Sequence, residues 1–170
     1  MIKPIGVDDV EELRAVALNA YKDHYLHYWY DNGDWYINKS FSVSQLSKEL
    51  SDINAKFYII YWRDEAVGFL KLNIDAPLEY NPTVNSLELE RIYLIKAANG
   101  KGIGSALVDF VLNLAKHLNK QMVWLKVMNT SDGPIAFYKK QGFEICGTYH
   151  LHFEQMTAAL RGMYVMKKFI

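Results

Sequence analysis

A glycine-rich turn between a predicted strand and a predicted helix limits the folds that this chain can adopt. The stretch NGKGIGSALVDFVLNLAKHL (residues 99–118) has glycines at positions 100, 102 and 104, and an apolar pattern with helical spacing follows at once. The first N–H groups of a helix have no acceptor within that helix, and the helix dipole favours negative charge. Such a turn can therefore hold a pyrophosphate close to its backbone. The alternative is a tight turn that needs glycines only for steric reasons.

Two familiar phosphate-binding patterns do not fit this turn. The P-loop pattern G-x-x-x-x-G-K-[ST] is absent, and the dinucleotide pattern G-x-G-x-x-G would need a glycine where Ser105 stands. The dinucleotide pattern also belongs to the first strand of a parallel unit, whereas a front half rich in predicted hairpins precedes this turn. The pattern that remains is Asn99-x-x-Gly102-x-Gly104.

The other patterns along the chain predict an α/β (α+β) fold, a mixed sheet with helices on its faces. The length of 170 residues favours a single domain that spans residues 1–170. Strands are predicted over residues 1–5, 56–62, 67–74, 86–95, 122–128, 143–150 and 163–169, and helices over residues 7–24, 45–51, 103–118 and 133–140.

Composition and charge exclude several classes of protein. The 19 basic and 19 acidic residues cancel, which argues against a nucleic-acid or membrane-surface binder. The apolar runs are shorter than a membrane span, and the N-terminal stretch lacks the pattern of a signal peptide. The single cysteine fits a reducing compartment, so we expect a cytoplasmic protein. The histidine spacings match no strong zinc pattern, so we expect no metal site.

Two motifs resemble those of the GNAT family, the acetyl-CoA-dependent N-acetyltransferases. PIAFYKKQGFEICG (residues 134–147) resembles the closing motif A-x-x-F-Y-x-x-x-G-F of that family. ELERIYLIKAANGKGIGSAL (residues 88–107) resembles its central motif, a strand followed by [QR]-x-x-G-x-[GA] and a helix. This chain departs from the family pattern at Asn99, which stands at the [QR] position, and at Ser131 and Pro134 in and before the closing motif.

The resemblance implies a mixed, mostly antiparallel sheet of about six to seven strands, splayed at the central strands, with acetyl-CoA as cosubstrate. It implies that free backbone groups of the strand before the turn bind the pantetheine arm, and that the turn binds the pyrophosphate. It also allows a homodimer. The expected coenzyme-binding residues are Ile92, Tyr93, Leu94, Asn99, Gly100, Lys101, Gly102, Ile103, Gly104, Ser105, Asn129 and Ser131.

Acetyl transfer to an amine requires a base, because an alkylammonium with a pKa of about 10.4 has no lone pair at pH 7. Glu88 and Glu90 alternate with leucines, so both carboxylates point to one face of a strand and either is a candidate base. An ion pair with a neighbouring lysine or arginine is the alternative for each of them. The leaving thiolate benefits from an acid, and Tyr138 occupies the position of the family's general-acid tyrosine. The alternative is that Tyr138 is a core aromatic residue.

The expected acceptor is a small cationic amine. Residues 73–90 contain four acids and no lysine or arginine, and the stretch over residues 21–41 interleaves aromatic residues with aspartates. Carboxylates and aromatic faces attract ammonium groups, although such a stretch can also be a packed cover. The stretch that includes INKSFSVSQLSKEL is similar to the bacterial spermidine/spermine acetyltransferase branch, which implies a polyamine acceptor. The candidate acceptor-binding residues are Tyr28, Trp29, Asp31, Trp35, Asp75 and Glu79.

Three other functions remain open from the sequence. The chain could acetylate peptide or protein N-termini, it could acetylate aminoglycosides, or it could be a non-catalytic acetyl-CoA-binding module. In the last case Tyr138 and both glutamates would be dispensable.

Overall fold

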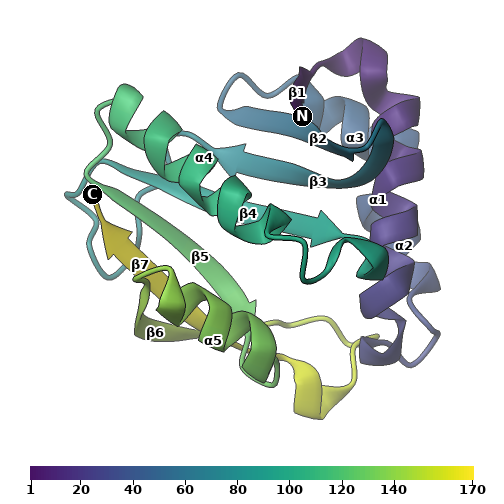
Figure 1. Ribbon diagram of the computed structural model, residues 1–170. Coiled ribbons are helices and arrows are strands. Elements are labelled where there is room, and N and C mark those ends of the chain that lie inside the picture. The colour runs from purple at the N-terminus through teal and green to yellow at the C-terminus, as the bar shows by residue number, and fades with distance from the viewer. The chain divides into compact units, whose positions relative to one another are not determined.

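The computed structural model describes residues 1–170, and its contacts divide the chain into two compact units. The first unit contains residues 1–72 and 91–101, and the second contains residues 73–90 and 102–170. Each unit is therefore built from separate stretches of sequence (Figure 1). The strands form a seven-stranded, mostly antiparallel sheet in the order β1-β2-β3-β4-β5-β7-β6, which confirms the predicted fold class.

The first unit combines an antiparallel front sheet with three helices. Strand β1 pairs antiparallel with β2, with Ile2 opposite Ile60. Strands β2 and β3 join through Arg63 and Asp64, both with positive φ, as in a two-residue hairpin turn. Helix α3 starts at a side-chain cap, because the Ser42 hydroxyl accepts a hydrogen bond from the Gln45 N–H. The elements that begin in this unit are β1 (Ile2–Ile5), α1 (Val10–His24), α2 (Asp34–Ser40), α3 (Val43–Leu50), β2 (Ala55–Trp62) and β3 (Glu65–Asn73).

The second unit contains the remaining strands and two helices. Strand β4 pairs in parallel with β5 over four residues, from Ser86–Met122 to Leu89–Leu125. Strand β7 pairs antiparallel with both β5 and β6. The sequence predicts the helices and strands of this unit to within one residue at each end. Its elements are β4 (Ser86–Leu94, which ends in the first unit), α4 (Ile103–His117), β5 (Met122–Met128), α5 (Asp132–Lys140), β6 (Glu144–His150) and β7 (Gly162–Phe169).

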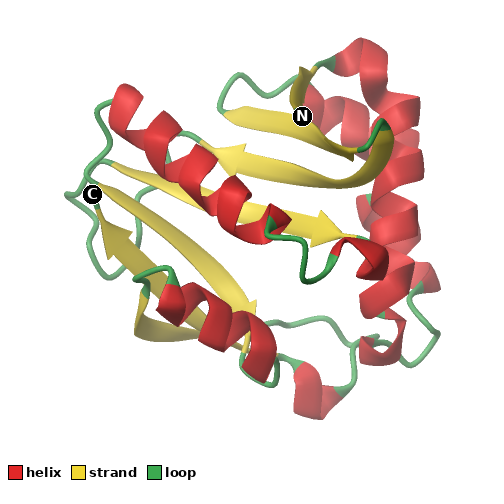
Figure 2. Ribbon diagram, in the orientation of Figure 1, coloured by secondary structure: helices red, strands yellow, loops and turns green.

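The chain also contains four short 3₁₀ turns and one helix, α2, that the sequence does not predict. The 3₁₀ turns span Val7–Asp9, Leu26–Tyr28, Lys96–Ala98 and Ala158–Leu160. The sequence does not predict α2, because its seven residues lie in the aromatic stretch and show no clear helical period. Figure 2 shows the helices and strands by colour. No helix is long and apolar enough to cross a membrane.

Apolar side chains fill the interior of each unit. They follow the helical period of about 3.6 residues and the strand period of two residues. In the first unit, Leu13 of α1 and Leu46 of α3 are fully buried, as are Ile59 of β2 and Phe69 of β3. In the second unit, a cluster forms around Trp124 of β5 and includes Leu78, Met122 and Val165. Leu78 comes from the long β3–β4 connection, so this loop folds onto the sheet and carries apolar surface into its interior.

Candidate active site

The glycine turn has the backbone geometry that an anion site needs. Gly100 and Gly102 have φ values of 72° and 76°, a left-handed conformation that side-chain-bearing residues rarely adopt. A Cβ added at either glycine would meet nothing within 4 Å, so the space beside this backbone is open. The first hydrogen bond of α4 runs from the Ala106 N–H to the Gly102 carbonyl, at 3.1 Å. The preceding N–H groups of α4 have no acceptor within the helix, and they fit a phosphate group.

Gly104, unlike Gly100 and Gly102, is a glycine because a neighbouring side chain leaves no room for a larger residue. A Cβ at Gly104 would lie 3.3 Å from Cζ of Phe137, which is tighter than an ordinary contact. The Gln141 side-chain amide also donates a hydrogen bond of 3.0 Å to the Ser105 hydroxyl. The two sequence motifs therefore contact each other in the second unit, and the steric explanation for glycine holds at Gly104.

The C-terminal half of β4 lies against elements of the first unit. His24 Nε2 lies 3.0 Å from the Leu94 carbonyl oxygen, and the Ile95 N–H donates a hydrogen bond to the Val67 carbonyl. A Cβ on Gly68 would overlap the Tyr93 carbonyl oxygen, so glycine is required for the approach of β3 to β4. Of the backbone groups predicted to bind a pantetheine arm, the Leu94 carbonyl therefore already has a partner.

Glu88 and Glu90 share one partner in the second unit, which confirms that they lie on the same face. The Asn73 side-chain amide donates to one carboxylate oxygen of each glutamate, at 2.8 Å in both cases. Lys126 Nζ also lies 3.1 Å from the other oxygen of Glu88 and forms an ion pair with it. Glu88 is buried, whereas Glu90 is only partly buried. The two carboxylates, which are equivalent in the sequence pattern, thus have different surroundings.

Asn73 and Lys126 are the members of this cluster that sequence reasoning missed. Asn73 lies at the end of β3, far in sequence from the glutamates, so no local pattern connects them. Lys126 had a signal that could have been used, because it is a charged residue inside the apolar strand sequence MVWLKVM. A lysine in such a strand needs a partner, and an acid on the neighbouring strand is the simplest one.

Tyr138 lies on α5 and is partly buried. Its ring packs edge-on against Phe137 and Phe143, with centroid separations of 5.1 and 5.8 Å. Two predicted coenzyme-binding residues lie just before this helix. The Asn129 N–H donates to the Gly162 carbonyl, and Ser131 is the residue before the first turn of α5.

Tyr28 and Trp29, two of the predicted acceptor-binding residues, are buried in an aromatic cluster of the first unit. The Trp29 indole N–H donates a hydrogen bond of 2.6 Å to the Tyr21 hydroxyl. The Tyr25 ring packs on Tyr21 and on Tyr93, with centroids 5.0 Å apart in both pairs. Burial raises the pKa of Tyr25 to about 12, and it also raises the pKa values of Tyr21 and Tyr93. This cluster forms a large part of the core that α1 contributes.

The Asp31 carboxylate holds the start of α2. One of its oxygens accepts a hydrogen bond of 3.0 Å from the Gly33 N–H, and the other accepts one of 2.7 Å from the Trp35 N–H. Trp35, also a predicted acceptor-binding residue, is partly buried, and the Lys39 ammonium lies 5.4 Å from its ring centroid. The backbone therefore uses both oxygens of Asp31, a residue that the sequence predicts to bind the acceptor amine.

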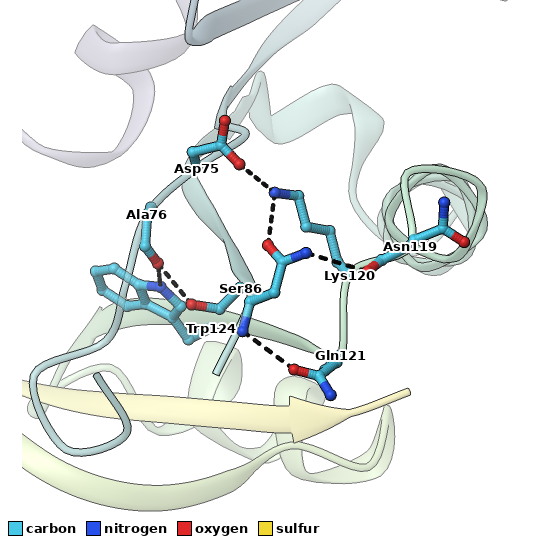
Figure 3. Close-up of polar contacts among 8 residues, drawn as sticks. Asp75, Ala76, Ser86, Asn119, Lys120, Gln121 and Trp124 are labelled. Atoms are coloured by element: carbon cyan, nitrogen blue, oxygen red, sulfur yellow. Dashed lines mark hydrogen bonds and ion pairs between the residues drawn. The ribbon is translucent and has the colours of Figure 1, made fainter. Parts of the chain in front are cut away.

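Asp75 anchors the β3–β4 loop, as Figure 3 shows. Its carboxylate pairs with the buried Lys120 ammonium, which also donates to the Asn85 side chain at 2.9 Å. The neighbouring Ala76 carbonyl accepts hydrogen bonds of 2.7 Å from the Trp124 indole and from the Ser86 hydroxyl. Glu79, the remaining predicted acceptor-binding residue, lies exposed on the same loop.

Comparison with known proteins identifies the family. The family model described as "Acetyltransferase (GNAT) family" matches residues 10–143, which is most of the chain. This chain belongs to the GNAT acetyltransferase family. The resemblance to the family is thereby confirmed at the level of the superfamily.

Relatives with a curated sequence or a solved structure agree with this assignment. The chain is 29% identical over 107 residues to the uncharacterized N-acetyltransferase in the pepI 3' region of Lactobacillus delbrueckii subsp. lactis, which is 63% of this chain and 62% of that protein. The chain thus spans about three fifths of that relative's length. PaiA N-acetyltransferase of Thermoplasma acidophilum in complex with coenzyme A has a similar fold, with a TM-score of 0.77 at 23% identity, over 100% of this chain and 98% of that one. Ribosomal-protein-alanine N-acetyltransferase of Brucella melitensis has a TM-score of 0.73 at 21% identity, over 100% and 99% of the two chains.

Proposed function

We propose that this GNAT protein transfers the acetyl group of acetyl-CoA to a primary amine of a small cationic acceptor, with a polyamine such as spermidine or spermine as the first choice. The observation that carries the proposal is the pair of carboxylates of Glu88 and Glu90, which one amide group, that of Asn73, holds on a single face of β4. A fixed pair of acids attracts an ammonium group and can take its proton.

Coenzyme A is held, in this proposal, mainly by backbone groups. The open space beside Gly100 and Gly102 and the first N–H groups of α4 support pyrophosphate binding by residues 99–105. Lys101 is exposed and adds a positive charge to this turn. Backbone groups of Ile92 and Tyr93 bind the pantetheine arm, and Asn129 and Ser131 are further candidates near the start of α5. The substitution of Asn99 for the family's longer side chain matters little to a site of this kind.

The reaction is a direct attack in a ternary complex. The acceptor ammonium first loses a proton to Glu90, directly or through a water molecule, and the free amine nitrogen then forms a bond to the thioester carbonyl carbon. The carbon–sulfur bond breaks, and the leaving sulfur receives a proton from the Tyr138 hydroxyl. The positively charged nitrogen of the intermediate loses its second proton, through water, to the Tyr138 phenolate, and Glu90 releases its proton to solvent, so the products are the acetylated amine and coenzyme A. We assign the base to Glu90 because it is more exposed than Glu88 and an acceptor can reach it more easily.

The choice of a polyamine rests on the acidic character of residues 73–90. Asp75 contributes less than the sequence suggests, because Lys120 pairs with it, and Asp31 is used by the start of α2. Glu79 remains exposed on the β3–β4 loop, so a second ammonium group of the acceptor can pair with it. The sequence similarity to the spermidine/spermine branch points in the same direction, and the protein is expected to act in the cytoplasm.

The decisive experiment is a turnover assay with acetyl-CoA and a panel of acceptors. The panel contains spermidine, a neutral-tailed amine of similar length, an aminoglycoside and a peptide with a free N-terminal alanine. We expect the highest kcat/KM for spermidine, and we expect the Tyr138→Phe variant to lose on the order of 10²-fold in kcat while it still binds acetyl-CoA. Equal efficiency for spermidine and the neutral-tailed amine would refute the polyamine choice. Turnover of no acceptor, with coenzyme A bound, would indicate a binding module.

A further inference from the structure

The side-chain ammonium of Lys126 lies in a site of the kind that binds ammonium ligands. Lys126 Nζ is 3.1 Å from a carboxylate oxygen of Glu88. It is also 4.9 Å from the centroid of the Trp124 ring and 5.1 Å from the centroid of the Tyr149 ring. One carboxylate and two aromatic rings around a cation form the usual protein receptor for an amine.

Three contacts hold the walls of this site without help from Lys126. Glu88 accepts a hydrogen bond of 2.8 Å from the Asn73 amide, and it lies opposite Trp124 in the parallel register of β4 and β5. The Trp124 indole N–H donates to the Ala76 carbonyl, which fixes the plane of the ring. These partners belong to the backbone or to other strands, so the walls are expected to remain when the lysine side chain is removed.

Lys126 is the more exposed partner of this ion pair. Its side chain is 31% exposed, compared with 10% for Glu88, and the Tyr149 ring at the rim is 46% exposed. A lysine carries its charge on a flexible four-carbon stem. Because the stem is attached to β5, its ammonium has a high effective concentration at the site, and a dissolved amine competes poorly with it.

We propose that Lys126 is a specificity-determining residue that fills an ammonium-binding site with its own side chain and thereby excludes a second ammonium group of the acceptor from Glu88. This inference rests on the proposed function, because it concerns the same acceptor site. The reacting amine still reaches Glu90, while the other charges of a polyamine must bind farther out, for example at Glu79. Lys126 therefore limits the advantage of a polyamine over a monoamine.

The test replaces Lys126 with methionine, which keeps an unbranched apolar stem and removes the charge. The probes are 1,4-diaminobutane and butylamine, which differ in one ammonium group. We expect Lys126→Met to increase the ratio of kcat/KM for the diamine to that for butylamine by roughly tenfold, and calorimetry to show a similar gain in diamine affinity. Lys126→Arg keeps a cation in the site, so its ratio should stay near that of the wild type.

Two further variants assign the gain to the carboxylate. In the double variant Glu88→Gln with Lys126→Met the gain in diamine affinity should disappear, because the carboxylate that binds the second ammonium is gone. Lys167→Met is the matched control: Lys167 lies opposite Trp124 on the adjacent strand β7, but its ammonium contacts Asn81 and the exposed carboxylate of Glu144, and not Glu88. It removes the same charge and should leave the diamine-to-monoamine ratio unchanged.

Diamine affinity and selectivity that stay at wild-type values in folded Lys126→Met would overturn the proposal, as would an equal gain in Lys167→Met. Circular dichroism and thermal unfolding establish that each variant is folded, and Lys126→Gln serves as the second neutral variant if methionine is not tolerated. Failure of the proposed function looks different. The wild type would then acetylate none of the amines, while calorimetry would still report the tighter binding of the diamine to Lys126→Met.

Discussion

Two glutamates with similar burial occupy opposite kinds of environment. In the first unit, Glu49 of α3 pairs with Lys71 at 2.8 Å and with Arg91 at 3.1 Å, and all three side chains are at most 12% exposed. In the second unit, Glu88 is 10% exposed, but its partner Lys126 is 31% exposed. Every member of the Glu49 group, which we call the closed group, is thus largely shielded from solvent, whereas the Glu88 group, the open group, is exposed at its lysine.

The difference separates a structural role from a chemical one. Burial on its own would raise the pKa of Glu49, yet Arg91, Lys71 and Gln45 outweigh it and hold this pKa below its ordinary value. A closed group of this kind fixes α3 against β3 and β4, because the carboxylate is paired with a cation from each strand. A carboxylate with a movable partner can exchange that partner for a ligand, and a second carboxylate beside it can take a proton. We therefore expect substitutions in the closed group to change stability and substitutions in the open group to change activity.

The largest expected effect is a loss of activity in the open group, on substitution of the carboxylate beside Glu88. Glu90→Gln keeps the shape of the side chain and removes the proton acceptor, so kcat for acetyl transfer should fall by about 10³-fold. The free energy of unfolding should change little, because Glu90 is only partly buried. Steady-state kinetics with acetyl-CoA and the best acceptor of the panel, together with urea unfolding, measure the two quantities. A Glu90→Gln variant with wild-type kcat would remove Glu90 from the chemistry and return the role of base to Glu88.

The closed group should show the opposite behaviour. Glu49→Gln leaves the buried Lys71 and the partly buried Arg91 without their carboxylate, which should lower the free energy of unfolding by about 3 kcal/mol. The pH dependence of the free energy of unfolding at acid pH gives a second test of this expectation. Because the pKa of Glu49 is lower in the folded state than in the unfolded state, its contribution is present above the unfolded pKa of about 4.3 and is lost as the pH falls through the folded pKa.

Lys126→Met provides the comparison for Glu49→Gln, since it breaks an ion pair that is open to solvent. Its loss of stability should be smaller, about 1 kcal/mol. Urea unfolding at neutral pH and at pH values below 4.3 tests both statements for each variant. Equal losses of stability in the two variants would contradict the distinction between a closed and an open pair.

The sequence predicts more of the fold than of the acceptor site. Local periodicity is sufficient for most helices and strands, and the period of two places Glu88 and Glu90 on one face, as the shared Asn73 amide confirms. The sequence correctly predicts the glycine turn as a strand–helix connection. Gly100 and Gly102 have positive φ there, a conformation that residues other than glycine rarely adopt. Partners far apart in sequence escape this reasoning: no local pattern links Lys120 with Asp75, or Lys126 with Glu88.

The aromatic stretch over residues 21–41 also shows that local sequence is not sufficient to assign a function. Its composition suits both a packed core and a cation-binding surface, and only the three-dimensional contacts separate the two. Trp29 donates to the Tyr21 hydroxyl, and both residues are buried, so much of the stretch belongs to the core of the first unit. Asp31 could have been interpreted as a helix start from sequence, because an aspartate shortly before a helix commonly bonds to its first N–H groups.

The buried aromatic cluster of the first unit gives an effect on stability that appears only at alkaline pH. Burial disfavours the charged phenolate and raises the pKa of Tyr25 to about 12, whereas an unfolded chain ionises its tyrosines near pH 10. The neutral form of Tyr25 therefore stabilises the folded state fully below pH 10, and this contribution is lost as the pH rises from 10 through 12. The free energy of unfolding should fall by about 2 kcal/mol over that interval on account of Tyr25.

Urea unfolding between pH 9 and pH 12, followed together with tyrosinate absorbance, measures the loss. Tyr25→Phe keeps the ring and removes the titrating hydroxyl, so its stability should decline less over the same interval. If the variant and the wild type lose stability in parallel, Tyr25 titrates normally in the folded protein, and the cluster is open to solvent in the way that the Glu88 group is.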